Sequence, residues 1–273
     1  HEHRRQRQMC IRDRHNIVNA SIALRNAQKA KGEEIGSLLK EAKEYIDEAY
    51  NNESTSNEAK MWNYRAPIYL EIALKKPELD EDAIIKATDA HLKCLQKGKK
   101  DRIIVRKWTS KENILAGLIQ CGYKLFNLGI DTYNEGDYRK SLTYYEKIFA
   151  IVPFDEEDQL KRGNITKETI LYNSYFSSNK LKDDSKSKEL LQKLIDINFN
   201  EPAIYIHMSD IFKREDNIEK TIEYLNLGRD MFEDDQSLIN TEINLYIELG
   251  RTSELVSKLG EAINLDPENS LLY

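Results

Sequence analysis

The side chains best suited to chemistry are few and lie far apart in this chain. Of its five histidines and three cysteines, His91, His207, Cys94 and Cys121 fall within helical patterns. The two cysteines have no CxxC spacing and no metal-site partner, so we expect small buried thiols and neither a zinc site nor a disulfide. His91 falls at a packing position, where a buried role is expected.

Sequence signatures of catalysis are missing as well. The chain has no glycine-rich phosphate loop and no HExxH, GxSxG or protein-kinase pattern, and its acidic residues are spread along helices. We therefore expect no enzymatic activity, no catalytic residue, no bound metal and no cofactor.

One positive cluster stands out in a chain whose net charge is −6. Its members are Lys93, Lys97, Lys99, Lys100, Arg102, Arg106, Lys107 and Lys111. Trp108 is the one aromatic residue among them, whereas single-strand nucleic-acid sites interleave cations with stacking rings. We interpret residues 97–111 as a solvated basic linker, with an acidic partner as the alternative, and expect no nucleic-acid partner.

Composition indicates which elements must position these side chains. Of the 273 residues, 40% are hydrophobic and 32% charged, and five prolines and eleven glycines leave long stretches able to form helices. No uncharged apolar run reaches the roughly 18 residues of a membrane span. The sequence predicts a mainly α-helical protein without a span in this fragment.

The first residues differ in character from the rest. Residues 1–14 lack apolar periodicity, and the segment from Met9 to Asp13 resembles a translated adapter of sequencing libraries. We predict a non-native leader outside the fold, and hence a fragment that lacks its natural start.

A repeated length is the strongest signal in the chain. Blocks beginning at 168, 202 and 236 are spaced by 34 residues and align without gaps, and a fourth block covers 122–155. Block 122–155 carries Leu125, Leu128, Gly129, Tyr145 and Pro153 at positions 4, 7, 8, 24 and 32. This pattern resembles the tetratricopeptide (TPR) repeat family, of the bacterial multi-repeat type.

The resemblance gives each of these positions an expected role. Gly129 should let two helices approach closely, Gly136 should supply a left-handed turn residue, and Pro153 should end the second helix. Leu128 is expected to be buried. Residues 156–167 interrupt the period and contain the turn signal Gly163-Asn164, so we expect an exposed, mobile loop.

The resemblance implies an all-α fold, a right-handed superhelical solenoid of antiparallel helix pairs with about 12 helices. We predict a leader at 1–14, degenerate TPR-like pairs at 15–111 and a TPR array at 112–273. The array comprises the repeats 122–155, 168–201, 202–235 and 236–269 and a truncated repeat from 270.

In TPR proteins the first helix of each pair lines a concave face, which implies a set of partner-binding residues here. The predicted set is Tyr123, Phe126, Asn127, Ile130, Tyr133, Tyr172, Asn173, Phe176, His207, Asn240 and Asn244. Asn134, Asn179 and Asp210 occupy further positions of the same kind. The alternative is that some of these side chains only brace the neighbouring repeat.

The resemblance implies a non-catalytic scaffold that binds a protein or peptide partner. A chaperone C-terminal tail is disfavoured, because of the clamp positions used by tail-binding TPR domains only Asn173 carries the expected residue. The alternative function is the binding or regulatory arm of a larger enzyme, such as a glycosyltransferase, whose catalytic domain lies outside the fragment. The family suggests the bacterial cell envelope or periplasm, with a cytoplasmic scaffold as the alternative.

Overall fold

The computed structural model describes residues 2–98 and 101–265, with the side chains of 15–98 and 101–264. The described residues are almost entirely helical, and their one β-type contact is an isolated bridge between Lys97 and Ile103. The predicted all-α, TPR-like architecture is confirmed. The truncated repeat expected from residue 270 lies outside the described residues.

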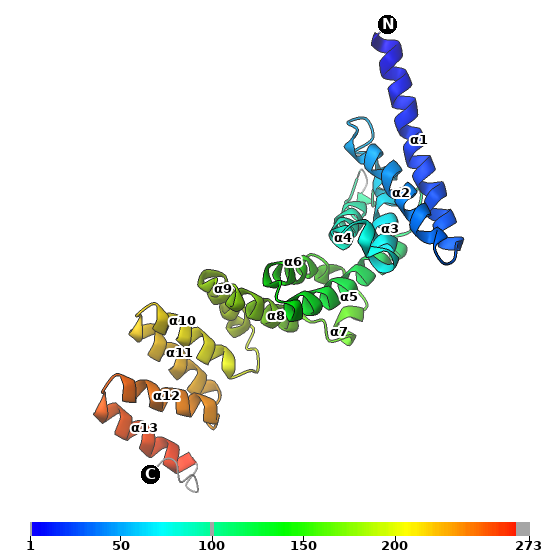
Figure 1. The fold of residues 1–273 in the computed structure, drawn as a ribbon. Coiled ribbons are helices and arrows are strands. Elements are labelled where there is room, and N and C mark those ends of the chain that lie inside the picture. Colours follow the sequence, from blue (N-terminus) through cyan, green and yellow to red (C-terminus); the bar gives the residue numbers. More distant parts are fainter. Residues whose placement is uncertain (1, 99–100, 266–273) are drawn as a thin grey trace. The chain divides into compact units, whose positions relative to one another are not determined.

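Twelve of the helices follow one another as six pairs, each folding back on itself (Figure 1). The pairs are α1 (Glu2–Lys29) with α2 (Glu34–Asn51), α3 (Ala59–Lys75) with α4 (Ala83–Cys94), α5 (Lys111–Glu135) with α6 (Tyr138–Phe149), α8 (Lys167–Lys180) with α9 (Asp184–Asp196), α10 (Ala203–Arg214) with α11 (Ile218–Met231), and α12 (Gln236–Glu248) with α13 (Thr252–Leu265). The short elements are η1 (Pro77–Leu79), η3 (Val152–Phe154) and α7 (Gln159–Arg162).

The chain divides into two compact units, residues 1–170 and residues 171–273. In the first, apolar side chains such as Ile17, Ile46, Met61 and Leu125 belong to one buried cluster. In the second, Ile239, Ile243 and Ala262 form a buried cluster between α12 and α13.

The predicted division at residue 111 and the non-native character of residues 1–14 stay predictions. None of the described helices combines the length and apolar character that crossing a membrane requires.

The backbone has the same left-handed conformation at position 15 of every predicted block. Gly136, Lys182, Asp216 and Gly250 hold positive φ angles of 88°, 57°, 55° and 64° there. Each ends the turn between the two helices of its pair, where a left-handed residue lets the chain reverse. Two of the four blocks therefore keep the turn geometry without keeping glycine.

The residue at position 16 caps the N-terminus of the second helix in three of the pairs. The side chains of Asp137, Asp183 and Asn217 each accept a hydrogen bond from the backbone N–H three residues later. This is the usual N-cap arrangement, in which a short polar side chain satisfies an otherwise unpaired amide. The last block has Arg251 at this position and lacks the capping residue type.

The packing of α5 on α6 confirms one expectation and corrects two. An added Cβ on Gly129 would lie 2.7 Å from the ring of Tyr145, so glycine allows the close approach as predicted. Leu125 is fully buried, but Leu128 is only half-buried, contrary to expectation. The helix α6 ends at Phe149, before Pro153, which instead sits inside η3.

Most residues of the insertion at 156–167 are exposed, as expected, but the segment is partly packed and partly helical. It contains α7, whose Leu160 is 1% exposed and lies against α5 at Gly122. The Asp155 carboxylate accepts hydrogen bonds from the backbone N–H groups of Gln159 and Leu160 at 2.7 and 2.9 Å. The buried leucine and the capped turn together hold the insertion on the first unit.

The helix α5 also begins earlier than its repeat block. It starts at Lys111, and the Ser110 hydroxyl accepts from the Asn113 N–H at 3.2 Å as its N-cap. The additional N-terminal part of α5, residues 111–121, packs on α4, where an added Cβ on Gly117 would lie 2.2 Å from His91 Nε2.

Candidate functional site

The predicted binding residues on α5 divide into two kinds. Tyr123 donates a hydrogen bond to the Gln159 carbonyl at 2.5 Å, Phe126 packs edge-on against Tyr145, and Tyr133 packs edge-on against Tyr138. These three side chains therefore brace the insertion and α6. Asn127 and Ile130 are exposed and remain available to a partner.

In the second unit, predicted residues from α8 and α10 meet in one aromatic cluster. Tyr172 and Phe176 have ring centroids 4.7 Å apart, and Phe176 lies 6.4 Å from His207. All three are half-buried, so part of each ring faces outward. The spacing of Tyr172 and Phe176 by four residues places both on one side of α8.

Two further rings belong to this cluster and were missed by sequence reasoning. Tyr175 stacks on His207 at 5.2 Å and is 2% exposed, and Phe199 lies 5.4 Å from Tyr172. Tyr175 occupies position 8, where the family pattern has a small residue, so its bulk fills the space between α8 and α10. Its spacing of three residues from Tyr172 was the available signal.

The cluster sets the charge state of His207. Burial lowers the pKa of His207 below its usual value, and the nearby Asp210 and Glu201 oppose that shift only in part. Burial also raises the pKa of Tyr172. Near neutral pH the cluster therefore presents an uncharged imidazole and protonated phenols, which suits apolar and hydrogen-bonding contacts more than charged ones.

Predicted carboxamides lie on the neighbouring first helix, α12. Asn240 and Asn244 are exposed and make no side-chain hydrogen bond to another described residue. Asn244 and Asp210 line a hollow of about 180 Å³ between α12 and α10. Lys213 and Glu248, which also line this hollow, form an ion pair.

Asn173 lies on α8 between Tyr172 and Ser174 and is half-buried. We call Tyr172, Asn173, Phe176, His207, Asp210, Asn240 and Asn244 the first-helix surface of the second unit. They come from α8, α10 and α12, the first helices of three successive pairs. The structure brings Tyr172, Phe176 and His207 together and places Asn244 in one hollow with Asp210.

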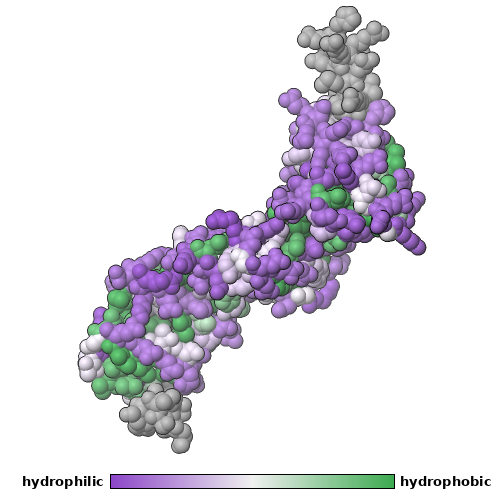
Figure 2. Space-filling view, in the orientation of Figure 1, coloured by the Kyte–Doolittle hydropathy of each residue, from purple (hydrophilic) through white to green (hydrophobic). Residues whose placement is uncertain are grey.

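Hydrophobic side chains are also exposed outside the predicted set. Figure 2 shows them gathered over the last helix pair, where Ile247 is 56% and Val256 64% exposed. Single apolar side chains on a protein surface are common and carry no functional meaning by themselves.

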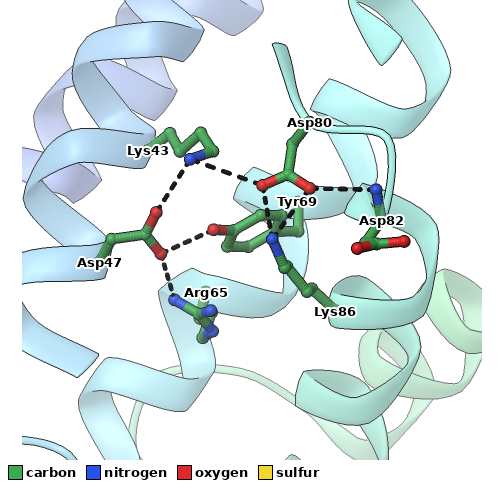
Figure 3. Close-up of polar contacts among 7 residues, drawn as sticks. All are labelled: Lys43, Asp47, Arg65, Tyr69, Asp80, Asp82 and Lys86. Atoms are coloured by element: carbon green, nitrogen blue, oxygen red, sulfur yellow. Dashed lines mark hydrogen bonds and ion pairs between the residues drawn. The ribbon is translucent and has the colours of Figure 1, made fainter. Parts of the chain in front are cut away.

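A second polar arrangement, in the first unit, was not predicted from the sequence (Figure 3). Asp47 of α2 accepts hydrogen bonds from Arg65 at 2.7 Å, from the Tyr69 hydroxyl at 2.6 Å and from Lys43 at 3.1 Å. The Arg65 guanidinium also lies 4.0 Å from the centroid of the Tyr50 ring. These contacts join α2 to α3.

The same arrangement extends to the turn before α4. Asp80 accepts from Lys86 at 2.6 and 2.9 Å and lies 3.5 Å from Lys43, as the dashed lines in Figure 3 show. Lys43 therefore bridges the two carboxylates. Residues from α2, α3 and α4 meet here with a spacing that no local sequence pattern reveals.

The electrostatics of this network point to structure and not to catalysis. Burial favours a raised pKa for Asp47, but the hydrogen bonds from Tyr69, Arg65 and Lys43 outweigh it and hold that pKa below its usual value. Burial and the hydrogen bond to Asp47 raise the pKa of Tyr69. Asp47 is thus a fully engaged carboxylate and Tyr69 a protonated donor, with no proton available at neutral pH.

The buried thiols and imidazole of α4 and α5 are also inert. Burial raises the pKa of Cys94 and of Cys121 to about 12, which leaves the thiolate unpopulated. The His91 ring donates from Nδ1 to the Ala87 carbonyl at 2.7 Å, and burial lowers its pKa to about 4. Within residues 2–98 and 101–265, no group of three or more metal-ligating side chains comes together.

In the last block, a charged residue occupies a position at which the repeat pattern has an apolar residue. Glu242, at position 7 of the last block, is 3% exposed. Its carboxylate lies 3.1 Å from Lys258 Nζ and 3.5 Å from Arg229 Nε. These two cations neutralise a carboxylate that would be costly to bury alone.

Comparison with known proteins gives a resemblance of structure only. No family model and no curated protein matches the chain. Similar solved structures include one described as the functional characterisation of Pseudomonas aeruginosa pilF, at 16% identity and a TM-score of 0.37, with 96% of each chain covered. Another is PilW, a widely conserved type IV pilus biogenesis factor, at 13% identity and a TM-score of 0.43, covering 93% of this chain and 96% of that one.

A third is the Cut9–Hcn1 hetero-tetramer of APC/C, at 11% identity and a TM-score of 0.33, covering 90% of this chain and 63% of that chain. With TM-scores this low, the function of the chain has to be argued from its own residues. Those residues form repeated helix pairs with a partly exposed aromatic and carboxamide surface on the first helices of the second unit.

Proposed function

We propose that the protein is a non-catalytic interaction scaffold that binds an extended peptide segment of a partner protein along the first-helix surface of the second unit. The observation that carries this proposal is the half-exposed ring cluster of Tyr172, Phe176 and His207 on α8 and α10, together with the exposed carboxamides on the next first helix, α12. Such a surface has groups suited to a polypeptide.

Each part of the surface matches one part of a peptide. The ring faces of Tyr172 and Phe176 provide a large contact area for apolar side chains at a low cost in side-chain entropy. The carboxamides of Asn240 and Asn244 both donate and accept, so each can pair with the N–H and C=O of an extended backbone. Three successive first helices repeat these contacts, which favours an elongated ligand over a small molecule.

The charge state of the surface further limits the class of partner that it could bind. A neutral His207 stacked on Tyr175 does not supply the cation that a C-terminal carboxylate would require. This supports a partner segment recognised through its side chains and backbone, and it argues against a chaperone tail. On α5, Asn127 and Ile130 form a smaller second patch of the same type.

A selection experiment tests the proposal. A phage-displayed library of random peptides is panned on the immobilised protein, and the affinity of the enriched peptides is measured for the wild type, Asn244→Ala and Asn226→Ala. Asn226 is exposed on α11, a second helix, and provides a matched control. We expect Asn244→Ala to weaken binding about tenfold, because a backbone-pairing amide is lost, and Asn226→Ala to leave it unchanged.

Two outcomes contradict the proposal. One is that no peptide binds the wild type saturably. The other is that Asn244→Ala and Tyr172→Ala bind the enriched peptides as tightly as the wild type does, which would place the binding site elsewhere.

A further inference from the structure

The two segments that interrupt the repeat line a common groove in the first unit. The basic connector between α4 and α5 forms one side through its described residues 95–98 and 101–110, and residues 153, 154 and 156 after α6 form the other. Lys111 Nζ and Glu156 Oε1, 2.5 Å apart, join the two sides. The groove has a volume of about 640 Å³, within the range of protein ligand sites.

Part of the groove is apolar. Leu95 is 8% exposed at its base, and the side chains of Ile103 and Phe154 are half-buried along it. Pro153 is exposed beside Phe154. These side chains offer a surface on which an apolar group of a ligand would be shielded from water.

The groove is lined by more positive than negative side chains. Its two carboxylates are both paired, Asp101 with Lys97 at 2.9 Å and Glu156 with Lys111 at 2.5 Å. Arg102 and Arg106 also line the groove, both are exposed, and neither has an ion pair among the described residues. A chain with a net charge of −6 thus carries two uncompensated guanidinium groups beside an apolar surface.

We propose that this groove binds an acidic peptide segment of a partner protein in which hydrophobic side chains alternate with carboxylates. Each of Arg102 and Arg106 can hold a carboxylate through two parallel N–H···O bonds. The neighbouring hydrophobic side chain of the peptide would then pack against Ile103 and Phe154. This site is additional to the proposed function, because none of its residues belongs to the first-helix surface.

A single-stranded RNA is the rival ligand for a basic groove. Non-specific RNA sites combine cations with several aromatic faces on which successive bases stack. Phe154 is the one aromatic residue among the described residues that line this groove. An isolated ring beside aliphatic side chains favours a peptide.

Fluorescence anisotropy on the full chain tests this site. The probe is a short fluorescein-labelled peptide of alternating glutamate and leucine, and the comparison peptide has serine in place of every leucine. We expect saturable binding of the first peptide and at least about fivefold weaker binding of the second, because the serine peptide retains the charges and loses the apolar contact.

Variants locate the site. Arg102→Glu/Arg106→Glu should weaken binding of the glutamate–leucine peptide about tenfold or more, because two charge-assisted pairs are lost. Arg102→Lys/Arg106→Lys keeps the charge but loses the two-pronged geometry, and we expect an intermediate affinity. The matched control is Arg25→Glu/Lys40→Glu, which makes the same charge change at two exposed sites outside the groove and should bind within about twofold of the wild type.

Three results would overturn the inference. The wild type fails to bind the glutamate–leucine peptide, the groove and control variants lose affinity equally, or an oligouridine of equal charge binds more tightly than the peptide. Because the first-helix surface is untouched in these variants, peptides selected for that surface should bind them normally, so failure of one site is distinguishable from failure of the other.

Discussion

Gly136 and Lys182 hold the same left-handed backbone at the same position of two repeats, with φ angles of 88° and 57°. Glycine adopts this conformation without steric cost, whereas a residue with a Cβ is strained there by about 1 kcal/mol. We therefore predict that Lys182→Gly raises the free energy of unfolding by up to about 1 kcal/mol, measured by urea denaturation.

The converse substitution is the control for that prediction. Gly136→Ala should lower stability by about 1 kcal/mol or more, because nothing else crowds the site and the conformational strain alone is added. If Lys182→Gly were destabilising, the side chain of Lys182 would be making contacts that outweigh the strain of its backbone.

The repeat register can be tested in the core of the first unit. Leu125, at position 4, is 0% exposed, so Leu125→Ala should lower the free energy of unfolding by about 2–5 kcal/mol. Asn127, two residues further, is exposed, and Asn127→Ala should stay within about 0.5 kcal/mol of the wild type. Comparable losses in the two variants would contradict the register.

The buried imidazole of His91 predicts a specific pH dependence of stability. Its pKa is lowered from 6.5 to about 4 in the folded protein, so between these values the unfolded chain binds more protons. The contribution of His91 is fully present above pH 6.5 and is lost as the pH falls toward 4, for a total of about 3 kcal/mol.

The variant His91→Gln isolates this effect. Denaturation curves of the wild type and variant are recorded from pH 4 to 8, and their difference removes the titration of the other groups. The stability advantage of the wild type should shrink as the pH falls below 6.5. A difference that does not change with pH would mean that His91 has the same pKa in the folded and the unfolded protein.

The network around Asp47 predicts that removing the Asp47 carboxylate lowers the stability of the fold more than removing the Asp89 carboxylate does. Asp47→Asn leaves Arg65, which is 6% exposed, without its anionic partner, and we expect a loss of about 2–4 kcal/mol. Asp89→Asn removes a carboxylate that is exposed and paired with Lys147, and it should cost less than about 1 kcal/mol. Thermal unfolding of the two variants measures the contrast, and equal losses would show that the network adds nothing beyond a surface ion pair.

The sequence assigned the candidate site residues to first helices but could not show which of them would be engaged by neighbouring side chains. Tyr123, Phe126 and Tyr133 are engaged with the insertion and α6, whereas Tyr172 and Phe176 join His207. Membership of a first helix follows from spacing along the chain. Contact with a second element depends on how separate helices dock, as for Tyr123 with Gln159 and Phe126 with Tyr145, which periodicity does not encode.

The sequence by itself determined the helix pairs and predicted a 34-residue register for them, because the signals involved are local. Turn residues such as Gly136 and caps such as Asp137 act on backbone groups within about four residues. Only the tertiary structure decided that Leu160 packs the insertion onto the first unit and that Asp47, Arg65 and Asp80 converge on one network. Such contacts form when separate helices dock, and their energy depends on burial and charge pairing that exist only in the folded chain.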